Sequence, residues 1–255
     1  RELILVAQDP TAYGEDWGRP GAICELLDRL QEIDGIRWVR ILYAYPERIS
    51  DEFIAAMVRN TKVVPYLDLP IQHCDDAVLK AMNRRGGRKE IEDAIARLRA
   101  AIPGITLRTT LIAGFPGETE EQYAELCDFV KTVRFDRLGC FAYSAEENTV
   151  AAKMPNQIDE ETKQRRADHI MELQAEVSAE REGEKVGHTY ECICDGVDDE
   201  TGMYLLRTKA DCPEIDGNVL TPADTPLETG AFYKVTITDS DTYDLYGYAE
   251  ERLED

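Results

Sequence analysis

The sequence predicts an α/β domain built on a parallel sheet, followed by a small all-β unit. Two observations carry this prediction. Up to about residue 182, segments with strand character alternate with segments of helical periodicity, and after Gly183 short strands follow one another without a helical stripe. Regular alternation of strand and helix implies a parallel sheet, either doubly wound or curved into a barrel. We therefore divide the chain into 1–182 and 185–255.

Five strands are expected in the first part. Each is a run of apolar and β-branched residues that stops at glycine, proline or a cluster of polar residues, which is typical of strands that enter a turn. The runs cover 2–9, 38–46, 66–73, 105–115 and 137–144.

The helices expected between these strands carry their own start signals. Ser50 and Asp75 each precede apolar residues at helical spacing, and Thr119 with Gln122 forms a capping box. A further stripe recurs at helical spacing from Ile91 to Ile102, and a last long helix is expected from about Asp159 to Glu182.

The second unit, 185–255, reads as a five-stranded barrel because its short strands are broken by Gly, Asp, Asn and Pro. It has 5 Lys and Arg against 17 Asp and Glu, a net charge of −12, within a chain of net charge −22. Such a surface repels nucleic-acid phosphates and attracts basic partners. A solvated surface that only keeps the protein soluble is the alternative.

The composition also indicates the cellular compartment in which the protein is found. No run of about 18 apolar residues is present, so no membrane span is expected, and no signal or transit pattern opens the chain. Seven scattered cysteines, odd in number, indicate reduced thiols and a cytoplasmic location. Cys192 and Cys194 have C-x-C spacing and could form a zinc site with His188 and Cys212, although buried apolar side chains are the simpler interpretation.

Polar residues gather at the ends of the predicted strands, where ligands bind in folds of this class. Alternation along 105–115 places an apolar set on one face and Arg108, Thr110, Ile112 and Gly114 on the other. An arginine on the inner face needs a partner or a wet cavity. Either Arg108 pairs with Asp68 of the neighbouring strand and only closes the sheet, or Arg108 and Gln72 line a pocket for a polar ligand.

The stretch "RTTLIAGFPGET", 108–119, ends this strand abruptly. Gly114 would let a ligand approach the backbone, and the helix that begins at Thr119 would offer free N–H groups. Neither a Ser/His/Asp set, nor a Walker loop, nor an H-E-x-x-H motif is present in the sequence. The residues alone therefore indicate an enzyme-like α/β domain with a polar mouth and an acidic β unit.

Several long motifs in a fixed order resemble the radical S-adenosylmethionine methylthiotransferases. The resemblance covers nearly the whole chain and includes a C-terminal TRAM domain. It implies a partial (β/α)6 radical SAM barrel, TIM-like, followed by a TRAM barrel. The motifs are "LILVAQDPTAYG" (3–14), "RILYAYPERISDE" (40–52), "YLDLPIQHCDDAVLKAMNRRG" (66–86), "LRTTLIAGFPGETEEQY" (107–123) and "GCFAYSAEENTVAAKMPNQI" (139–158).

Two branches of this family matter here. One methylthiolates the β-carbon of an aspartate in protein twelve of the small ribosomal subunit, and the other modifies adenosine in transfer RNA. "VAQD" (6–9) and 108–119 resemble the ribosomal-protein branch. The acidic β unit agrees, because it would repel tRNA and attract a basic ribosomal protein. The tRNA branch, and a non-catalytic fragment that only docks a ribosomal protein, are the alternatives.

The resemblance implies S-adenosylmethionine and two 4Fe–4S clusters as cofactors, with a sulfur donor and an electron donor as further partners. One cluster is held by a C-x-x-x-C-x-x-C loop, in which three thiolates leave one iron open for S-adenosylmethionine. No pair of cysteines in this chain has that spacing. We therefore expect a chain that lacks an N-terminal part of the intact enzyme, contains no cluster ligands and is inactive by itself.

The resemblance also implies a set of cofactor-pocket residues but no catalytic residue. In such barrels the fifth strand supports the adenine and methionyl groups, the sixth lines the adenine side, and polar residues contact the polar groups of the cofactor or the sulfur donor. Glu118 lies one place from the usual acidic position and receives no role. The matching positions are Gln8, Gln72, Arg108, Thr110, Ile112, Gly114, Phe141 and Tyr143.

Overall fold

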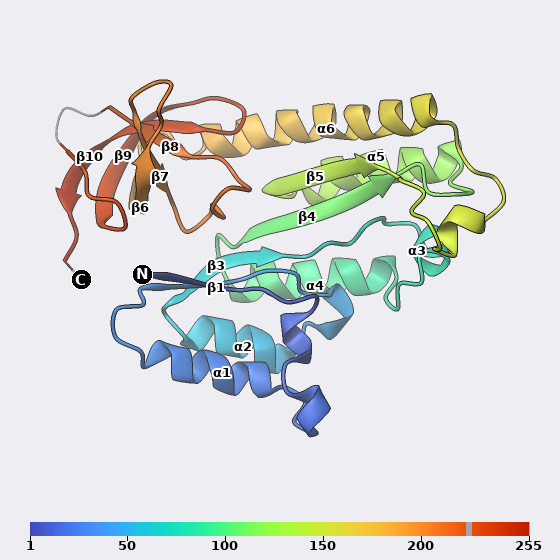
Figure 1. Cartoon of the computed structure of the whole chain (residues 1–255), viewed down its shortest axis with the longest axis horizontal. Coiled ribbons are helices and arrows are strands. Elements are labelled where there is room, and N and C mark those ends of the chain that lie inside the picture. Colours follow the sequence, from blue (N-terminus) through green and yellow to red (C-terminus); the bar gives the residue numbers. More distant parts are fainter. Residues whose placement is uncertain (223–225, 255) are drawn as a thin grey trace.

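The first part of the molecule is a five-stranded parallel sheet in the order β1-β2-β3-β4-β5 (Figure 1). A computed structural model describes residues 1–222 and 226–254 of the chain. The sheet confirms the expected parallel α/β architecture. Its strands are β1 (Glu2–Leu5), β2 (Trp38–Ile41), β3 (Val63–Asp68), β4 (Thr106–Ala113) and β5 (Arg137–Ala142).

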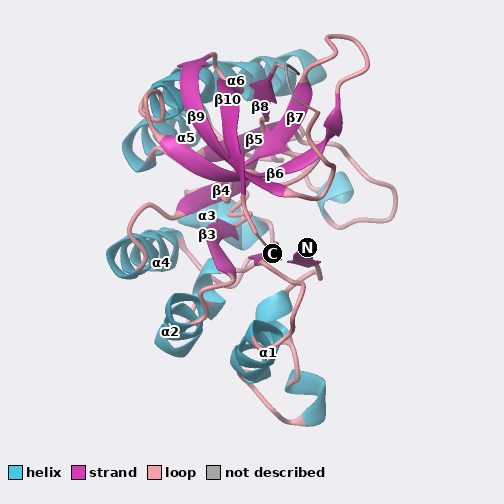
Figure 2. Cartoon of the chain, turned by 90° about the vertical axis from the view of Figure 1, so that its left-hand side faces the viewer, coloured by secondary structure: helices cyan, strands magenta, loops and turns pink. Residues whose placement is uncertain are grey.

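The helices lie mostly on one side of this sheet. Figure 2 shows α1, α2, α4 and α5 following one another around the same side, which leaves the other face of the sheet without such a layer. No described helix combines the length and the apolar character needed to cross a bilayer. The helices are α1 (Ala22–Gln31), α2 (Asp51–Arg59), α3 (Asp76–Ala81), α4 (Arg88–Ala101), α5 (Glu120–Val133) and α6 (Glu160–Gly183), with 3-10 turns η1 (Pro10–Ala12), η2 (Glu15–Trp17), η3 (Pro46–Arg48) and η4 (Ala151–Lys153).

The predicted helix starts are confirmed at the side chains that cap them. Ser50, Asp75, Thr119 and Asp159 each accept a hydrogen bond from the backbone N–H three residues further on. At Thr119 the capping box is complete, because Gln122 accepts in return from the Thr119 N–H (2.9 Å). Local side-chain chemistry therefore fixes where these helices begin.

The strands are shorter than the sequence predicts. β1 ends at Leu5 rather than at residue 9, because Asp9 instead caps η1 by accepting from the Thr11 N–H (3.0 Å). β3 begins three residues earlier, at Val63, and ends at Asp68 rather than at residue 73, and β4 ends where Gly114 turns to φ +76°. Apolar character continues past each strand end, so hydrophobicity alone overestimates strand length.

Helix α1 is absent from the sequence-based prediction. Its N-cap is Gly21 with φ +79°, which offers no side-chain hydrogen bond to the helix. The apolar stripe of Ile23, Leu27 and Leu30 is nevertheless buried on the sheet side of the helix. The periodicity was present in the sequence, whereas the usual Ser, Thr, Asp or Asn start signal was not.

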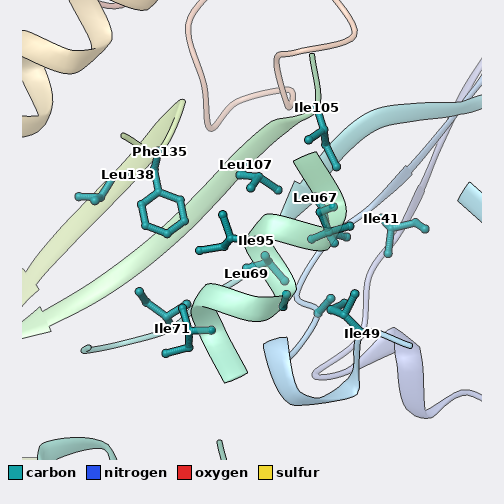
Figure 3. Close-up of a cluster of buried hydrophobic side chains, with 14 of the residues drawn as sticks. Ile41, Ile49, Leu67, Leu69, Ile71, Ile95, Ile105, Leu107, Phe135 and Leu138 are labelled. Carbon is teal, nitrogen blue, oxygen red and sulfur yellow. The ribbon is translucent and has the colours of Figure 1, made fainter. Parts of the chain in front are cut away.

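The two faces of β4 divide as predicted. Leu107, Leu111 and Ala113 are fully buried under the helices, whereas Arg108 and the alternate residues after it are only half-buried. Figure 3 shows the core on the covered side, where Ile95 of α4 lies among side chains of the strands such as Leu107. Burial of this apolar surface, at about 25 cal/mol per Å², provides the main stabilisation of the sheet.

The second part is a closed five-stranded barrel in the order β10-β8-β7-β6-β9, which confirms the expected barrel. It has its own core, in which Cys192 and Cys194 pack with Leu206 and Val235. These two cysteines thus act as buried apolar side chains. The strands are β6 (Thr189–Val197), β7 (Tyr204–Arg207), β8 (Val219–Thr221), β9 (Phe232–Ser240) and β10 (Leu245–Arg252).

The barrel packs at the amino ends of the sheet strands, at the opposite end of the sheet from α3 (Figure 1). Trp38 of β2 meets Phe232 of β9 edge to face, with ring centroids 4.9 Å apart. Buried ion pairs also join the two parts: Arg137 binds Glu182 of α6 and Asp211 of the barrel. The carboxyl ends of the strands are therefore left to the loops of the first part.

Candidate functional site

A cavity of about 690 Å³ lies at the carboxyl ends of β3 and β4. It is enclosed by the segment after β3, by α3 and the loop that follows it, and by the loop after β5. Most of its wall is apolar, and a few polar side chains converge on it, which is the usual character of a small-molecule site. The apolar lining comes from Ala81, Met82, Ile112, Phe115, Val150, Ala151 and Met154, and the polar lining from Gln72, Lys80, Asn83, Arg84 and Tyr143.

Gln72 is held in an unusual conformation at the edge of this cavity. Its φ is +69°, a region that few residues other than glycine adopt. Two hydrogen bonds to β4 impose it: the Gln72 N–H donates to the Thr110 carbonyl (2.9 Å), and the Ile112 N–H donates to the Gln72 carbonyl (2.8 Å). The side-chain Oε1 is buried and has no partner among the described residues. Backbone strain and an unused acceptor together indicate a position built to meet a ligand.

Tyr143 supplies a second unused polar group. Its ring packs edge to face on Phe115 (centroids 5.3 Å apart), and the Lys163 ammonium lies 5.2 Å from its centroid. The phenolic oxygen is buried without a hydrogen-bond partner in the described part of the chain. Because buried hydroxyls are normally hydrogen-bonded, the Tyr143 hydroxyl is a second group that a ligand in the cavity would satisfy.

The turn after β4 is held together by the buried carboxylate of Glu118. Its Oε2 accepts from the Gly114 N–H (3.0 Å), and its Oε1 accepts from Arg166 Nη1 of α6 (2.7 Å). His73 Nδ1 accepts from the Asp75 N–H (3.0 Å), which leaves its proton on Nε2, 3.4 Å from Glu118 Oε2. Glu118 therefore organises the turn, and His73 Nε2 lies beside its carboxylate without a hydrogen-bond partner among the described residues.

Gly114 has a packing reason to be glycine. A Cβ added there would lie 2.5 Å from Cγ and 2.9 Å from Cβ of Lys163. The backbone at the end of β4 therefore contacts the Lys163 side chain of α6 in the space where any other residue would place its Cβ. Gly114 is buried against α6, and it shapes the wall behind the cavity.

Arg108 lies at the other end of β4. It pairs with Asp68 (3.1 Å), in register with it on β3, and with Asp216 of the barrel (3.6 Å). Burial raises the pKa of Asp68 above its ordinary value, while the Arg108 charge acts in the opposite direction. The ion pair considered from the sequence is present, and a barrel loop completes it.

The predicted pocket residues thus fall into three groups. Gln72, Ile112 and Tyr143 line the cavity. Thr110 and Phe141 lie beside it on the same face of the sheet, because Phe141 pairs with Ile112 in register, and Phe141 is 61% exposed. Outside the lining lie Gln8, which is exposed in the loop after β1, together with Arg108 and Gly114.

Loop residues that no strand end marks also line the cavity, and Arg84 is the most informative of them. Its Nη2 donates to the Pro70 carbonyl (2.8 Å), and its guanidinium stacks over the Tyr45 ring at 4.4 Å. It separates the cavity from a neighbouring one of about 610 Å³ that also contains Asp9 and Arg48. The "NRRGG" turn (83–87), with Asn83 at φ +62°, was the signal that could have identified it.

The residues present fit an organic cofactor better than a metal cluster. An apolar slot with an unused acceptor and an unused hydroxyl suits a heteroaromatic ring that carries an amine. All seven cysteines are free thiols, six of them buried and only Cys140 partly accessible. Over residues 1–222 and 226–254, no three His, Cys, Asp or Glu side chains form a group that could hold a metal ion. Together with the absence of C-x-x-x-C-x-x-C spacing, this arrangement does not fit a 4Fe–4S cluster.

Comparisons with known proteins agree on the family. The Radical SAM superfamily matches residues 1–130, and the TRAM domain matches residues 186–249. The chain is 46% identical to the ribosomal protein uS12 methylthiotransferase RimO of Lachnoclostridium phytofermentans, over 98% of this chain and 57% of the relative. It is 45% identical to RimO of Desulforamulus reducens, over 97% of this chain and 56% of the relative. The chain thus spans just over half the length of these curated relatives.

A solved structure shows the same fold at lower identity. Coproporphyrinogen III oxidase (HemN) from Escherichia coli, described as a radical SAM enzyme, superimposes with a TM-score of 0.51 and 20% identity over 62% of this chain and 37% of that one. This likeness concerns the fold alone. The sequence matches to both of its parts show that the chain belongs to the radical SAM superfamily and, within it, to the RimO methylthiotransferase family.

Proposed function

We propose that this chain forms the S-adenosylmethionine-binding and partner-docking part of a uS12 methylthiotransferase. The observation that carries the proposal is the cavity at the strand ends, in which apolar walls surround two buried polar atoms without partners, Gln72 Oε1 and the Tyr143 hydroxyl. Its position at the carboxyl edge of a parallel sheet is where βα folds bind ligands. The reduced thiols of the chain accord with activity in the cytoplasm.

Each group of residues has a separate task in this proposal. Met82, Ile112 and Met154 exclude water and contact the adenine ring, while Gln72 Oε1 accepts from its amine. The Tyr143 hydroxyl bonds a polar group beside the ring. S-adenosylmethionine supplies the sulfonium group from which radical chemistry in this superfamily begins. Because the cysteines of this chain do not fit a cluster, we assign none of them a step in the reaction.

Calorimetric titration of S-adenosylmethionine into the chain tests the cavity. We expect saturable binding that Gln72→Asn weakens about fivefold or more, because the shorter amide keeps the left-handed backbone but withdraws the acceptor. Gln164→Asn, on the exposed face of α6, is the matched control and should bind as the unchanged protein does. No heat of binding at millimolar ligand would remove the cofactor role and leave a docking function alone.

For the partner, we propose uS12, engaged by the acidic barrel. The barrel region 185–255 has a net charge of −12, which favours a basic protein over a nucleic acid. Binding to purified uS12 that weakens as salt increases, with no binding to tRNA, is the expected result. Binding to tRNA in place of uS12 would instead support a tRNA-modifying relative. The sulfur donor and the electron donor belong to the same proposal for the complete enzyme.

A further inference from the structure

A second cavity, of about 440 Å³, lies at the junction of the sheet and the barrel. Its walls come from the beginnings of β4 and β5, from α6, and from two barrel loops that contain Ile215 and Tyr243. It shares no lining residue with the cavity at the strand ends. The ion pairs around Arg108 and Arg137 hold its two sides together, so the cavity is a fixed feature of the junction.

Two buried polar atoms on residues that line this cavity have no partner in the described part of the chain. Gln174 is 1% exposed, and while its Nε2 donates to the Phe135 carbonyl (2.9 Å), its Oε1 accepts nothing. Arg137 is 7% exposed, and while its two terminal nitrogens bind Glu182 and Asp211, its Nε donates to nothing. Leaving buried donors and acceptors unpaired is unfavourable, because they lose their bonds to water on folding. The residues that line the cavity therefore carry one unused acceptor and one unused donor, both of them buried.

The surroundings select the kind of ligand that would use both. A secondary amide carries one N–H and one carbonyl, which complement this pair. β5 is an edge strand, with no strand on the side away from β4, and there its Cys140 N–H reaches Met171 Sδ (3.2 Å) of α6 instead. α6 thus covers this edge at Cys140, whereas Arg137, Leu138 and Gly139 at the start of β5 line the cavity, and a chain added there would run beside them. Ile215 and Tyr243, each 46% exposed, add an apolar rim. Such a rim suits the side chain of a bound peptide better than it suits water.

We propose that this junction cavity binds an extended peptide segment of a protein partner. A backbone N–H of the segment donates to Gln174 Oε1, a backbone carbonyl accepts from Arg137 Nε–H, and a side chain packs on Ile215 and Tyr243. Asp244, also in the lining, and the net charge of −12 on 185–255 favour a basic residue beside the bound amide. This site shares no residue with the cofactor cavity, so peptide binding here can be tested independently of the proposed transferase function.

Nuclear magnetic resonance of the whole chain tests the site at its two atoms. The Arg137 Nε–H and Gln174 side-chain amide signals are followed while acetyl-Gly-Lys-Gly-methylamide, or N-methylacetamide as a minimal amide, is added. We expect the peptide to shift both signals with saturation. Gln174→Met should weaken the peptide about fivefold or more, and Tyr243→Ser, a rim change that leaves the core intact, should also weaken it. Gln164→Met on the exposed face of α6 is the matched control and should change nothing.

Three results would overturn the proposal. Saturation by N-methylacetamide without saturation by the peptide would mean that the cavity takes small amides and not a chain. Absence of any shift with either compound at millimolar concentration would mean that water completes the two groups. Unchanged peptide affinity in both Gln174→Met and Tyr243→Ser would place the peptide elsewhere on the surface.

Discussion

At Gly114 the backbone has φ +76° and lies so close to α6 that a Cβ would fall 2.5 Å from Lys163 Cγ. Three residues on, Gly117 has a similar φ of +85°, but nothing lies within 4 Å of an added Cβ. The two glycines of one turn therefore separate two costs, that of the left-handed backbone and that of the steric contact.

We expect Gly114→Ala to lower the free energy of unfolding by about 2–4 kcal/mol, because it adds overpacking to backbone strain. Gly117→Ala should lower it by only about 1 kcal/mol, the cost of the backbone conformation alone. Urea denaturation of the two variants measures both values. Equal losses would show that the contact with α6 relaxes at no cost.

The residues of the site were predictable to the extent that they lie at strand ends. Gln72, Ile112 and Tyr143 follow or end strands, and alternation along β4 gave the correct face. Arg84 and Met154 come from loops whose path depends on tertiary contacts, so no periodic pattern marks them. The second acidic partner of Arg108, Asp216, lies in the barrel, and only the packing of the two parts shows it.

At the scale of the elements, the Glu118 carboxylate joins the turn after β4 to α6. It is fully buried and receives hydrogen bonds from Gly114 and Arg166, whereas Glu120, which also pairs with Arg166, is exposed. Removing the charge of Glu118 leaves the buried Arg166 with only the exposed Glu120 as a partner, whereas losing the exposed pair costs little.

Glu118→Gln should therefore destabilise the protein by about 3–5 kcal/mol. Glu120→Gln, on the same arginine, should cost less than about 1 kcal/mol. Thermal and urea unfolding followed by circular dichroism provide the comparison. A loss in Glu120→Gln as large as that in Glu118→Gln would mean that the exposed pair, and not the buried one, anchors α6.

Elements were predicted well where the signal was local. Ser50, Asp75 and Thr119 start helices through hydrogen bonds made within one turn, so a few residues of sequence contain the whole cause. α1 was missed because Gly21 caps it through backbone conformation alone. Strand ends were misjudged because pairing with a neighbour, and not apolar character, decides where a strand stops.

At the scale of the whole molecule, charge pairs tie the barrel to the sheet. Burial acts to raise the pKa of Asp211, but Arg137 and Lys185 bring it down to about 2 from an ordinary 3.8. A depressed folded-state pKa means that the carboxylate stabilises the fold above about pH 4 and loses this contribution as the pH falls through about 2.

The pH dependence of unfolding follows from this sign. Over that acid window we expect the chain to lose about 2 kcal/mol through Asp211, and Asp211→Asn should abolish this part of the slope. Urea unfolding measured at several pH values tests it. Asp28, whose pKa hydrogen bonds from Arg59 and Asn60 lower to about 2 although it is exposed, is the control. High salt should remove the Asp28 contribution and spare that of Asp211.

Each half of the molecule contains a buried thiol whose reaction rate reports how often that half opens. Cys74 lies in the core of the sheet and Cys194 in the core of the barrel, and burial raises the pKa of Cys74 to about 12. Neither reacts with a thiol reagent until its surroundings open. Because Trp38 and Arg137 couple the halves, we expect both to be labelled at one common rate, measured by mass spectrometry of peptides. Faster labelling of Cys194 would mean that the barrel opens independently of the sheet. The labelling rate of each cysteine would then report the rate at which its half of the molecule opens.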